Sequence, residues 1–534
     1  MASTNGITVI KSFVSKLKPL IVIGGILFCY FFLAKVIFSS FFGYRLTDKL
    51  FGIFLILGET YILVHTIGYL FSIFRSPVRR VEAETRELGA GAPAVAVLVV
   101  ARHEPREILE KTLLSLTRLD YPSKRIYFLD DSDEPAFIRE ADELGKAFGV
   151  RVFRRGLRRG AKAGILNDFI GGIEEKYIAV FDADLNPVPE FLKKTVSIME
   201  SDANLAFVQA PQYASNLSDN PIVAGAAAQQ AVFYESICER KSAGNAMFCC
   251  GTNVVFRREA LLSVGGFDED SITEDFATSV RLHLKGYTSL FYSGVKAYGL
   301  SPETLGAYFK QQTRWAAGTV SVFAGLVKCF LKDPGAMSPL QWWEYFLSGT
   351  YYFIGWAFFM LMLCPVAYLL FGVPSFFART EIYVAAFIPS FLLTFIVYYS
   401  ARRGSRFKLK DFYHGTMLGL LGFPILMKSA LYGILGKKMA FEVTSKSRGE
   451  KMTWFSLWPW FLMACLNFTA LYEGFRLSAE SGFNTVIAVN MAWVLYHIFV
   501  LLNIFYFNRS SGPEAEQPGA FGAAVERVGA GGLE

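Results

Sequence analysis

Charged side chains are scarce in this sequence: they make up 19% of its 534 residues, whereas hydrophobic residues make up 53%. A chain this apolar is not intrinsically disordered, and its composition is not that of a collagen or a small disulfide scaffold. Its mean hydropathy of +0.35 is also higher than soluble multidomain enzymes usually reach. We therefore expect an integral membrane protein that contains a soluble domain.

Cysteine and histidine are also few. The sequence has seven cysteines without a CxxC pair, and five histidines that are scattered along the chain. This pattern is typical of neither a disulfide framework nor a zinc site. The cysteines that lie in or beside apolar runs are expected to behave as small hydrophobic residues.

Long apolar runs lie on both sides of a more polar middle. In a helix, about 20 apolar residues cross a hydrocarbon core of roughly 30 Å. About six runs meet this requirement, namely 19–42, 50–74, 344–371, 382–399, 454–472 and 484–507. A further stretch, 411–436, mixes apolar residues with basic residues and glycine. We interpret it as an interfacial segment, with a seventh span as the alternative.

Clusters of Lys and Arg predict the orientation of the chain. They follow the second and fourth apolar runs and precede the fifth. Basic loops face the cytoplasm, so we expect a multi-pass protein of the cell membrane whose middle domain and N-terminal tail (1–18) are cytoplasmic. The last segment, 510–534, is predicted to be disordered. Because the visible basic clusters lie beside spans, the net charge of +7 does not indicate nucleic-acid binding.

The middle of the chain, 93–335, alternates short β-rich runs with helical patterns. Strands are predicted at Val95–Val100, Ile126–Asp130, Val152–Phe153, Tyr177–Asp182 and Ala206–Gln209, and helices at Glu107–Thr117, Ala163–Ile170 and Pro189–Ser201. Such alternation indicates a mainly parallel sheet with helices on both faces. Ligands of these sheets bind beyond the carboxyl ends of the strands.

Two acidic motifs fall at such strand ends. They are Phe128-Leu-Asp-Asp-Ser-Asp133 and Val180-Phe-Asp-Ala-Asp184. Carboxylates two residues apart suit Mg²⁺ or Mn²⁺ that is bound together with a substrate diphosphate. Aspartates also favour turns through hydrogen bonds to the backbone, so either motif alone has a purely structural explanation.

Three later motifs have a structural and a functional explanation each. Glu274 has capping-box spacing from a preceding serine, which leaves Asp275 available as a general base. In Gln311-Gln-Thr-Arg-Trp315 the arginine can bind phosphate and the tryptophan can stack on a sugar, although interfacial helices are anchored by the same residue types. The segment Phe441–Lys446 is either a juxtamembrane loop or a loop that closes over a diphosphate.

Taken together, the motifs DDSD, DAD, FCCGT, TED, QQTRW and FEVTSK resemble those of processive family-2 glycosyltransferases, especially bacterial cellulose synthase catalytic subunits. The resemblance covers roughly 93–446 and the flanking spans. It implies an α/β GT-A catalytic domain embedded in an all-α transmembrane bundle of about six helices. It further implies a UDP-sugar donor, with UDP-glucose favoured, Mg²⁺ or Mn²⁺ as cofactor, inversion at the anomeric carbon, and extrusion of the polysaccharide through the protein's own channel.

The resemblance also implies a domain layout. Residues 19–74 would form two transmembrane helices, and 93–335 the GT-A domain with an interfacial helix near 304–331. Residues 336–509 would hold the remaining transmembrane and interfacial helices, with a gating loop at 441–446.

Roles for individual residues follow from the matching motif positions. Asp275 resembles the catalytic base, with Glu274 beside it. Donor-binding residues would be Asp131, Lys162, Asp182, Asp184, Gln311, Arg314, Thr444 and Lys446, with Asp184 and Asp182 holding the metal. Trp315, Cys250 and Gly251 would contact the acceptor, while Phe441 and Val443 complete the gating motif.

Three departures from the family pattern stand out. Ile165 replaces an asparagine that usually follows the lysine motif, and Asn167 is the nearest substitute. Only two spans precede the catalytic domain. No PilZ-like module follows the last span, so we expect no control by cyclic di-GMP within this chain.

The sequence leaves the product open. The same chemistry would serve a cellulose-like glucan, a β-1,3 or mixed-linkage glucan, a mannan or an amino-sugar polymer, because small displacements of the acceptor select the linkage. A non-catalytic membrane scaffold that binds glycans is the alternative from another class.

Overall fold

The structure is a computed structural model of the whole chain. It describes residues 24–25, 44–75, 91–218, 220–377, 381–385, 388, 392, 407–436, 451–482 and 484–509. The first expected span, most of the fourth, the gating loop at 441–446 and the segments 1–18 and 510–534 lie outside the described residues.

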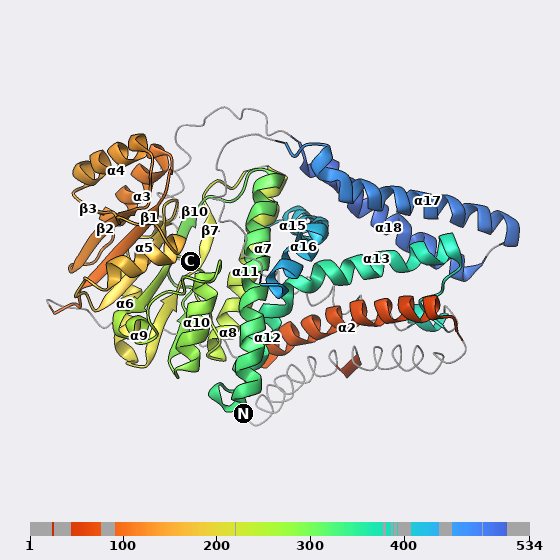
Figure 1. The fold of residues 1–534 in the computed structure, drawn as a ribbon, viewed down its shortest axis with the longest axis horizontal. Coiled ribbons are helices and arrows are strands. Elements are labelled where there is room, and N and C mark those ends of the chain that lie inside the picture. The colour runs from red at the N-terminus through yellow and green to blue at the C-terminus, as the bar shows by residue number, and fades with distance from the viewer. Residues whose placement is uncertain are drawn as a thin grey trace, which may run out of the picture.

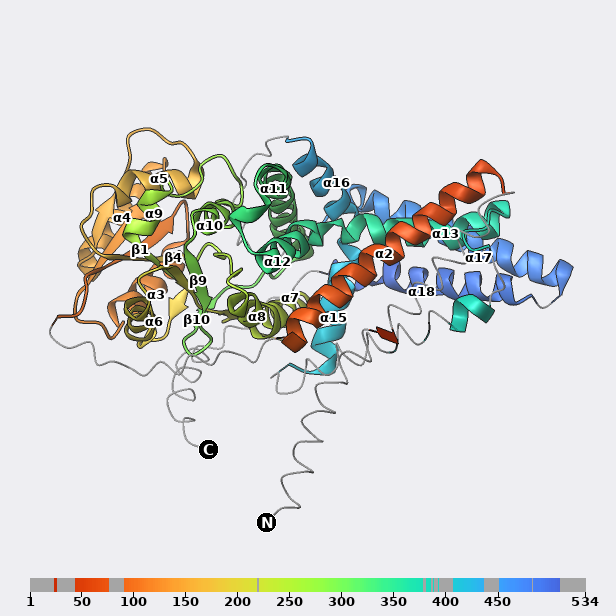
Figure 2. The ribbon, with the colours of Figure 1, turned by 90° about the horizontal axis from the view of Figure 1, so that it is seen from below.

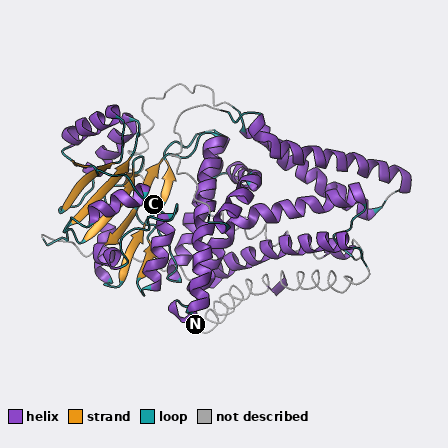
Figure 3. Cartoon of the chain, in the orientation of Figure 1, coloured by secondary structure: helices purple, strands orange, loops and turns teal. Residues whose placement is uncertain are grey.

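A seven-stranded sheet forms the centre of the polar middle domain (Figures 1 and 3). Its order is β3-β2-β1-β4-β8-β6-β9. The strands are β1 (Val95–Ala101), β2 (Lys124–Asp130), β3 (Arg151–Phe153), β4 (Tyr177–Asp182), β6 (Leu205–Gln209), β8 (Val254–Arg257) and β9 (Thr288–Phe291). Only β8 runs antiparallel to its neighbours in this sheet. The predicted, mainly parallel sheet is confirmed.

Alternate residues of β1 enter two separate hydrophobic cores. Val97 and Val99 belong to the core beneath α3 (Arg106–Thr117), α4 (Pro135–Phe148) and α6 (Phe191–Ser201). Ala96 and Leu98 belong to the core beneath α5 (Ala161–Ile170), α9 (Arg258–Ser263) and α10 (Glu274–Leu284). Successive side chains of a strand point to opposite faces, so the sheet is covered by helices on both faces, as the sequence predicts.

A small second sheet and a bent helix extend this domain towards the long helices. The sheet has the order β5-β10-β7, from β5 (Asn186–Pro187), β10 (Ala297–Gly299) and β7 (Gln212–Ala214). In the chain, β7 is followed by α7 (Pro221–Val232), a π-helical turn η1 (Phe233–Cys238) and α8 (Glu239–Ala243). None of this segment is predicted by the alternating pattern.

Five helices of the described chain are long and apolar enough to cross a membrane. They are Leu46–Tyr69, Leu305–Lys332, Pro339–Phe371, Phe455–Ser481 and Thr485–Phe507. In element terms they fall in α2 (Leu46–Arg75), α11 (Leu305–Lys332), α12 (Pro339–Thr350) with α13 (Ile354–Phe371), α17 (Trp458–Ser481) and α18 (Thr485–Phe507). The helical bundle that the sequence predicts is thus confirmed in fold class.

Two segments that we expect to be interfacial have distinct shapes. Helix α11 crosses the direction of α2 and α13, between the sheet and the long helices (Figures 1 and 2). The stretch at 411–436 forms α15 (Leu409–Leu421) and α16 (Phe423–Ile434), bent by 53° at Gly422. Together they are apolar enough for one broken span. Whether either segment lies in the interface stays a prediction.

Buried polar contacts join α12 to the polar middle domain. The Lys241 Nζ of α8 donates to the Glu344 carboxylate at 2.9 Å, and both side chains are 3% exposed. His283 of α10 lies 2.6 Å from the Tyr345 hydroxyl. Breaking a buried ion pair costs about 3–5 kcal/mol, so these contacts hold the polar middle domain against the long helices.

Candidate active site

One cavity of about 950 Å³ opens at the carboxyl ends of β1, β2 and β4. All the site residues predicted within the described chain line it: Asp131, Lys162, Asp182, Asp184, Cys250, Gly251, Glu274, Asp275, Gln311, Arg314 and Trp315. Residues from six separate parts of the sequence therefore meet where α/β sheets bind ligands. Thr444 and Lys446, with Phe441 and Val443, lie outside the described residues.

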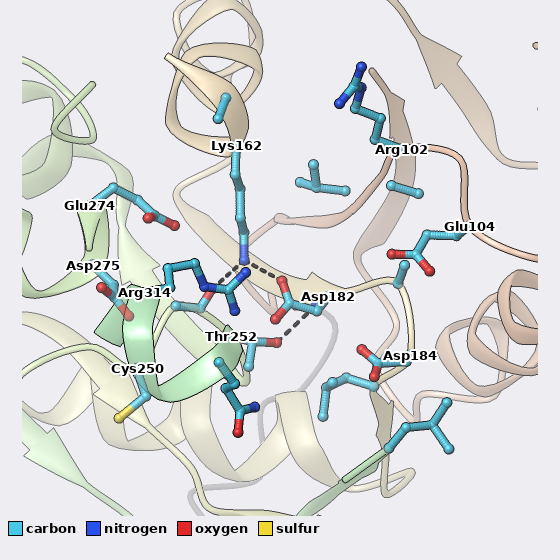
Figure 4. A pocket seen from close by; sticks show the side chains of 18 of the residues that line it. Arg102, Glu104, Lys162, Asp182, Asp184, Cys250, Thr252, Glu274, Asp275 and Arg314 are labelled. Atoms are coloured by element: carbon cyan, nitrogen blue, oxygen red, sulfur yellow. Dashed lines mark hydrogen bonds and ion pairs between the residues drawn. The ribbon is translucent and has the colours of Figure 1, made fainter. Parts of the chain in front are cut away.

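Lys162 joins Asp182, at the end of β4, to the loop that precedes the neighbouring strand β8. Its Nζ donates to the Asp182 carboxylate and, at 2.8 Å, to the Gly251 carbonyl (Figure 4). The Asp182 backbone N–H donates to Thr252 Oγ1 at 2.9 Å. Burial opposes the charge of Lys162, but the Asp182, Glu274 and Asp275 carboxylates outweigh it and raise its pKa. The lysine is therefore a fixed positive charge inside the cavity.

Asp131 is engaged by two arginines. Arg155 donates to both of its carboxylate oxygens, at 2.8 and 2.9 Å, and Arg158 donates through Nε at 3.1 Å. Arg155 is buried, whereas Arg158 lines the cavity. The arginine contacts were not predicted from the sequence. Asp131 therefore lies at the cavity wall as one member of a cluster of ion pairs, and not as an isolated carboxylate.

The Thr-Glu-Asp motif begins helix α10, but not through a capping box. Glu274 is the first helical residue, and Thr273 precedes it without a side-chain cap. The structural explanation for Glu274 is therefore wrong, because capping-box spacing places the acidic residue at the third helical position. Helix α11 presses on the same turn: a Cβ at Gly318 would lie 2.5 Å from Thr273 Cγ2. Only glycine permits this approach.

Asp275 faces a glycine in the left-handed region. Gly251 has φ +83°, and a Cβ added to it would lie 3.1 Å from Asp275 Oδ2. Burial, and then the neighbouring Glu274 carboxylate, raise the pKa of Asp275 to about 7. Burial also raises the pKa of Glu274. A carboxyl group with a pKa near neutrality is suited to proton transfer.

A buried glutamine that was not selected from the sequence positions the loop opposite Asp275. Gln209, the last residue of β6, accepts from the Cys250 N–H at 2.9 Å and donates to the Thr252 carbonyl at 2.8 Å. On the other side, the Ser279 hydroxyl accepts from the Cys249 N–H at 2.8 Å. The loop that carries Cys250 and Gly251 is therefore held from both β6 and α10.

One stripe of helix α11 forms a cavity wall. Thr304 caps the helix through its hydroxyl, and the cavity-lining positions that follow are Ala307, Gln311, Arg314 and Trp315. Their spacing of three or four residues places them on one helix face. Figure 4 shows the Arg314 guanidinium directed towards the region between Asp275 and Asp182. Arg314 also lowers the pKa of Glu274, against the larger effect of burial.

The cavity carries more carboxylates than cations. Its acidic residues are Glu104, Glu107, Asp131, Asp182, Asp184, Glu269, Asp270, Glu274, Asp275 and Glu303, and its basic residues are Arg102, Lys111, Arg158, Lys162 and Arg314. A diphosphate enters such a site readily only with a cation. Asp182, 41% exposed, and Asp184 offer oxygen ligands for one.

Within the described chain, no group of three or more His, Cys, Asp or Glu side chains could hold a metal ion. Two carboxylates fit Mg²⁺ or Mn²⁺, which are commonly bound by one or two carboxylates plus substrate phosphates. The residues present therefore fit a divalent cation that arrives with the nucleotide.

Comparisons with known proteins agree with these motifs. Residues 177–401 match the family model described as Glycosyl transferase family group 2. The chain is 27% identical over 470 residues to a cellulose synthase catalytic subunit (UDP-forming) of Pseudomonas fluorescens (strain SBW25), covering 85% of this chain and 61% of that protein. It is 24% identical over 482 residues to the cellulose synthase 1 catalytic subunit (UDP-forming) of Komagataeibacter xylinus, covering 87% and 63%.

This chain resembles bacterial cellulose synthase catalytic subunits. The resemblance stated from the motifs is confirmed, although the chain spans less than two thirds of the length of these two relatives. A solved mannosyltransferase, PcManGT from Pyrobaculum calidifontis in complex with GDP-Man and Mn²⁺, has a TM-score of 0.52 and 16% identity, over 73% of this chain and 100% of that one. This similarity concerns the fold, and the GT-A fold class is confirmed.

The structure shows what Ile165 and Asn167 do where the cellulose synthase pattern has an asparagine. Ile165 is fully buried in a core beneath the sheet. Asn167 donates to the Phe267 carbonyl and the Glu269 carboxylate, each at 2.9 Å, and does not line the cavity. Asn167 thus holds the loop before the Thr-Glu-Asp motif and does not replace the missing asparagine at the donor.

Proposed function

We propose that this protein is a metal-dependent, inverting and processive glycosyltransferase. It polymerises glucose from UDP-glucose into a β-linked, cellulose-like glucan and extrudes the chain through its own transmembrane helices. The observation that carries the proposal is the meeting of Asp182, Asp184, Lys162, Asp275 and Trp315 at one cavity. These residues would supply cation ligands, a diphosphate contact, a base and a sugar platform.

Asp275 is the proposed base. Its carboxylate takes the proton from the acceptor hydroxyl as that oxygen attacks the anomeric carbon of the donor sugar. The bond from this carbon to the diphosphate breaks on the opposite face, which inverts the anomeric configuration. A pKa of about 7 allows Asp275 to be charged at neutral pH and still bind the proton that it accepts.

Lys162 and Arg314 are proposed to bind the departing diphosphate. Lys162 is already held by Asp182 and the Gly251 carbonyl, so it needs little rearrangement when phosphate oxygens arrive. Preorganised charges of this kind stabilise a transition state more than mobile ones do. Asp184 and Asp182 would hold the divalent cation, which supplies neutralising charge to the diphosphate when bound.

The acceptor is proposed to lie against Trp315 and Cys250, on the side of the cavity formed by α11 and the 249–252 loop. A polysaccharide covered in hydroxyl groups cannot cross lipid without polar partners. The five long apolar helices packed beside the catalytic domain support a path through the protein. The basic clusters of the sequence support a cytoplasmic catalytic domain.

Purified protein in lipid, incubated with radiolabelled UDP-glucose and Mg²⁺ or Mn²⁺, tests the proposal. We expect a high-molecular-weight product that a β-1,4-specific glucanase degrades. UDP-GlcNAc and UDP-galactose, together with GDP-mannose, would be assayed in parallel. The Asp275→Asn variant is the inactive control.

Each negative result has a different meaning. A polymer that resists the β-1,4 glucanase, or one made from another sugar, would overturn the product and keep the chemistry. Donor binding without release of nucleoside diphosphate from any donor would overturn the enzyme and favour the glycan-binding scaffold.

A further inference from the structure

Three glutamines line the cavity without a hydrogen bond. They are Gln212, Gln230 and Gln311. Within the described part of the chain, their side-chain amides make no hydrogen bond, and Gln230 Oε1 is completely shielded from solvent. A buried acceptor without a donor costs about 1–3 kcal/mol, and such a group in a cavity calls for an explanation.

Gln229, the preceding residue on α7, is an example of a glutamine with a structural role. Gln229 accepts from the Tyr308 hydroxyl at 2.9 Å and donates to the Gly415 carbonyl at 2.6 Å, joining α7 to α11 and α15. Gln209 is likewise satisfied at both ends. Gln230 has neither kind of contact, so packing of α7 does not account for it.

The position of Gln230 places it on the acceptor side. It lies on α7 one helical turn before Tyr234, and residues about one turn apart share a helix face. Tyr234 and Cys250 belong to the same apolar cluster. Cys250 and Gln230 both line the cavity, as does Gln311 of the facing helix α11.

We propose that Gln230 binds a hydroxyl group of the acceptor glycan and so forms part of a specific sugar subsite. An amide both donates and accepts, which matches a sugar hydroxyl, whereas a diphosphate needs cations. Cys250, which lines the same cavity, packs against the apolar cluster of Tyr234, one helical turn beyond Gln230. This inference rests on the proposed function, because it assumes that a glycan chain enters the cavity.

The test measures binding instead of turnover. Wild-type protein and Gln230→Met, both in lipid nanodiscs, are titrated with cellopentaose and separately with UDP and Mg²⁺ by calorimetry. Loss of one hydrogen bond predicts cellopentaose binding weaker by about 3- to 10-fold. The affinity for UDP should stay within twofold. The thermal midpoint should be unchanged or higher, because methionine removes the unsatisfied oxygen.

The matched control is Gln312→Met, on α11 but outside the cavity lining, which should leave both affinities unchanged. The inference is overturned if Gln230→Met binds cellopentaose like the wild type, or if UDP binding weakens in parallel. If the thermal midpoint falls and the affinities for cellopentaose and UDP weaken equally, Gln230 has a structural role and the inference is also overturned. A separate assay of UDP release from UDP-glucose by the wild-type protein tests the proposed function. Absence of UDP release there would contradict the proposed function, whatever the binding data for Gln230→Met show.

Discussion

The proposed donor side and the proposed acceptor side of the cavity differ in how their polar groups are hydrogen-bonded. On the donor side, Lys162 is paired with Asp182, and Asp131 with Arg155 and Arg158. On the acceptor side, Gln230 has no hydrogen bond within the described chain. Charges cannot be left alone in a buried site, whereas neutral amides can remain unpaired at moderate cost. The donor side is therefore preformed, and the acceptor side is completed by its ligand.

The largest expected effect comes from Asp275, which lies between the two sides. Asp275→Asn keeps the size of the side chain but cannot accept the proton, so transfer should fall by about 10²- to 10⁴-fold. UDP release from UDP-glucose measures the loss, and UDP binding checks that the donor side is intact. Transfer that persists at the wild-type rate would remove Asp275 from the role of base.

The next largest effect concerns the cation. Chelation by EDTA, or the Asp184→Asn variant, should lower turnover by about 10²-fold or more, because the acidic cavity then repels the diphosphate. Calorimetry with UDP, with and without Mg²⁺ or Mn²⁺, measures the dependence. Cellopentaose binding serves as the control, since the acceptor side should not respond. If the affinities for UDP and cellopentaose weaken equally, the proposed donor and acceptor sides are not independent.

Lys162→Met removes one preformed charge from the donor side. A hydrogen bond to a charged group contributes about 1.5–3 kcal/mol, so UDP binding should weaken by about 10- to 100-fold. Lys176→Met is the matched control, because Lys176 pairs with Glu200 at the surface with 49% of its side chain exposed. Donor binding that is unaffected by the loss of Lys162 would show that its pairing with Asp182 is only structural.

The smallest effect is expected from pH. Asp275 acts as a base only when deprotonated, and its pKa is raised to about 7. The kcat/KM should therefore rise through pH 7 and fall about tenfold for each unit well below it. UDP release between pH 5.5 and 8.5 gives the profile. A profile that is flat across this range would contradict the raised pKa as the controlling titration.

The sequence predicted β1, β2 and β4 well, because they are short apolar runs, and β2 and β4 are followed by acidic motifs. It missed two strands of the same sheet, β9 and β8, of which β8 has four residues that are all buried. A short apolar run of this kind carries no period that separates strand from helix. It also suggested a capping box from Ser271 to Glu274, but the residue that precedes the first helical residue is Thr273, so the helix begins later than that spacing requires.

The chemical groups of the site and their order along the chain were set by the sequence alone. Carboxylates after strands, a basic and aromatic helix, and long apolar runs are local patterns, and local patterns can be read without a fold. Asp131, Asp182, Asp275 and Trp315 lie in motifs identified in this way, whereas Lys162 was named only through the resemblance to family-2 glycosyltransferases.

Only the tertiary structure decided which groups are already satisfied. Gln209 meets Cys250 across 41 residues, and Lys241 meets Glu344 across 103. Gln229 and Gln230 are neighbours with the same chemistry, yet one is fully hydrogen-bonded and the other faces the cavity with none in the described chain. The orientation of α7 against α11 and α15 separates them, because hydrogen bonding depends on distance and direction in space.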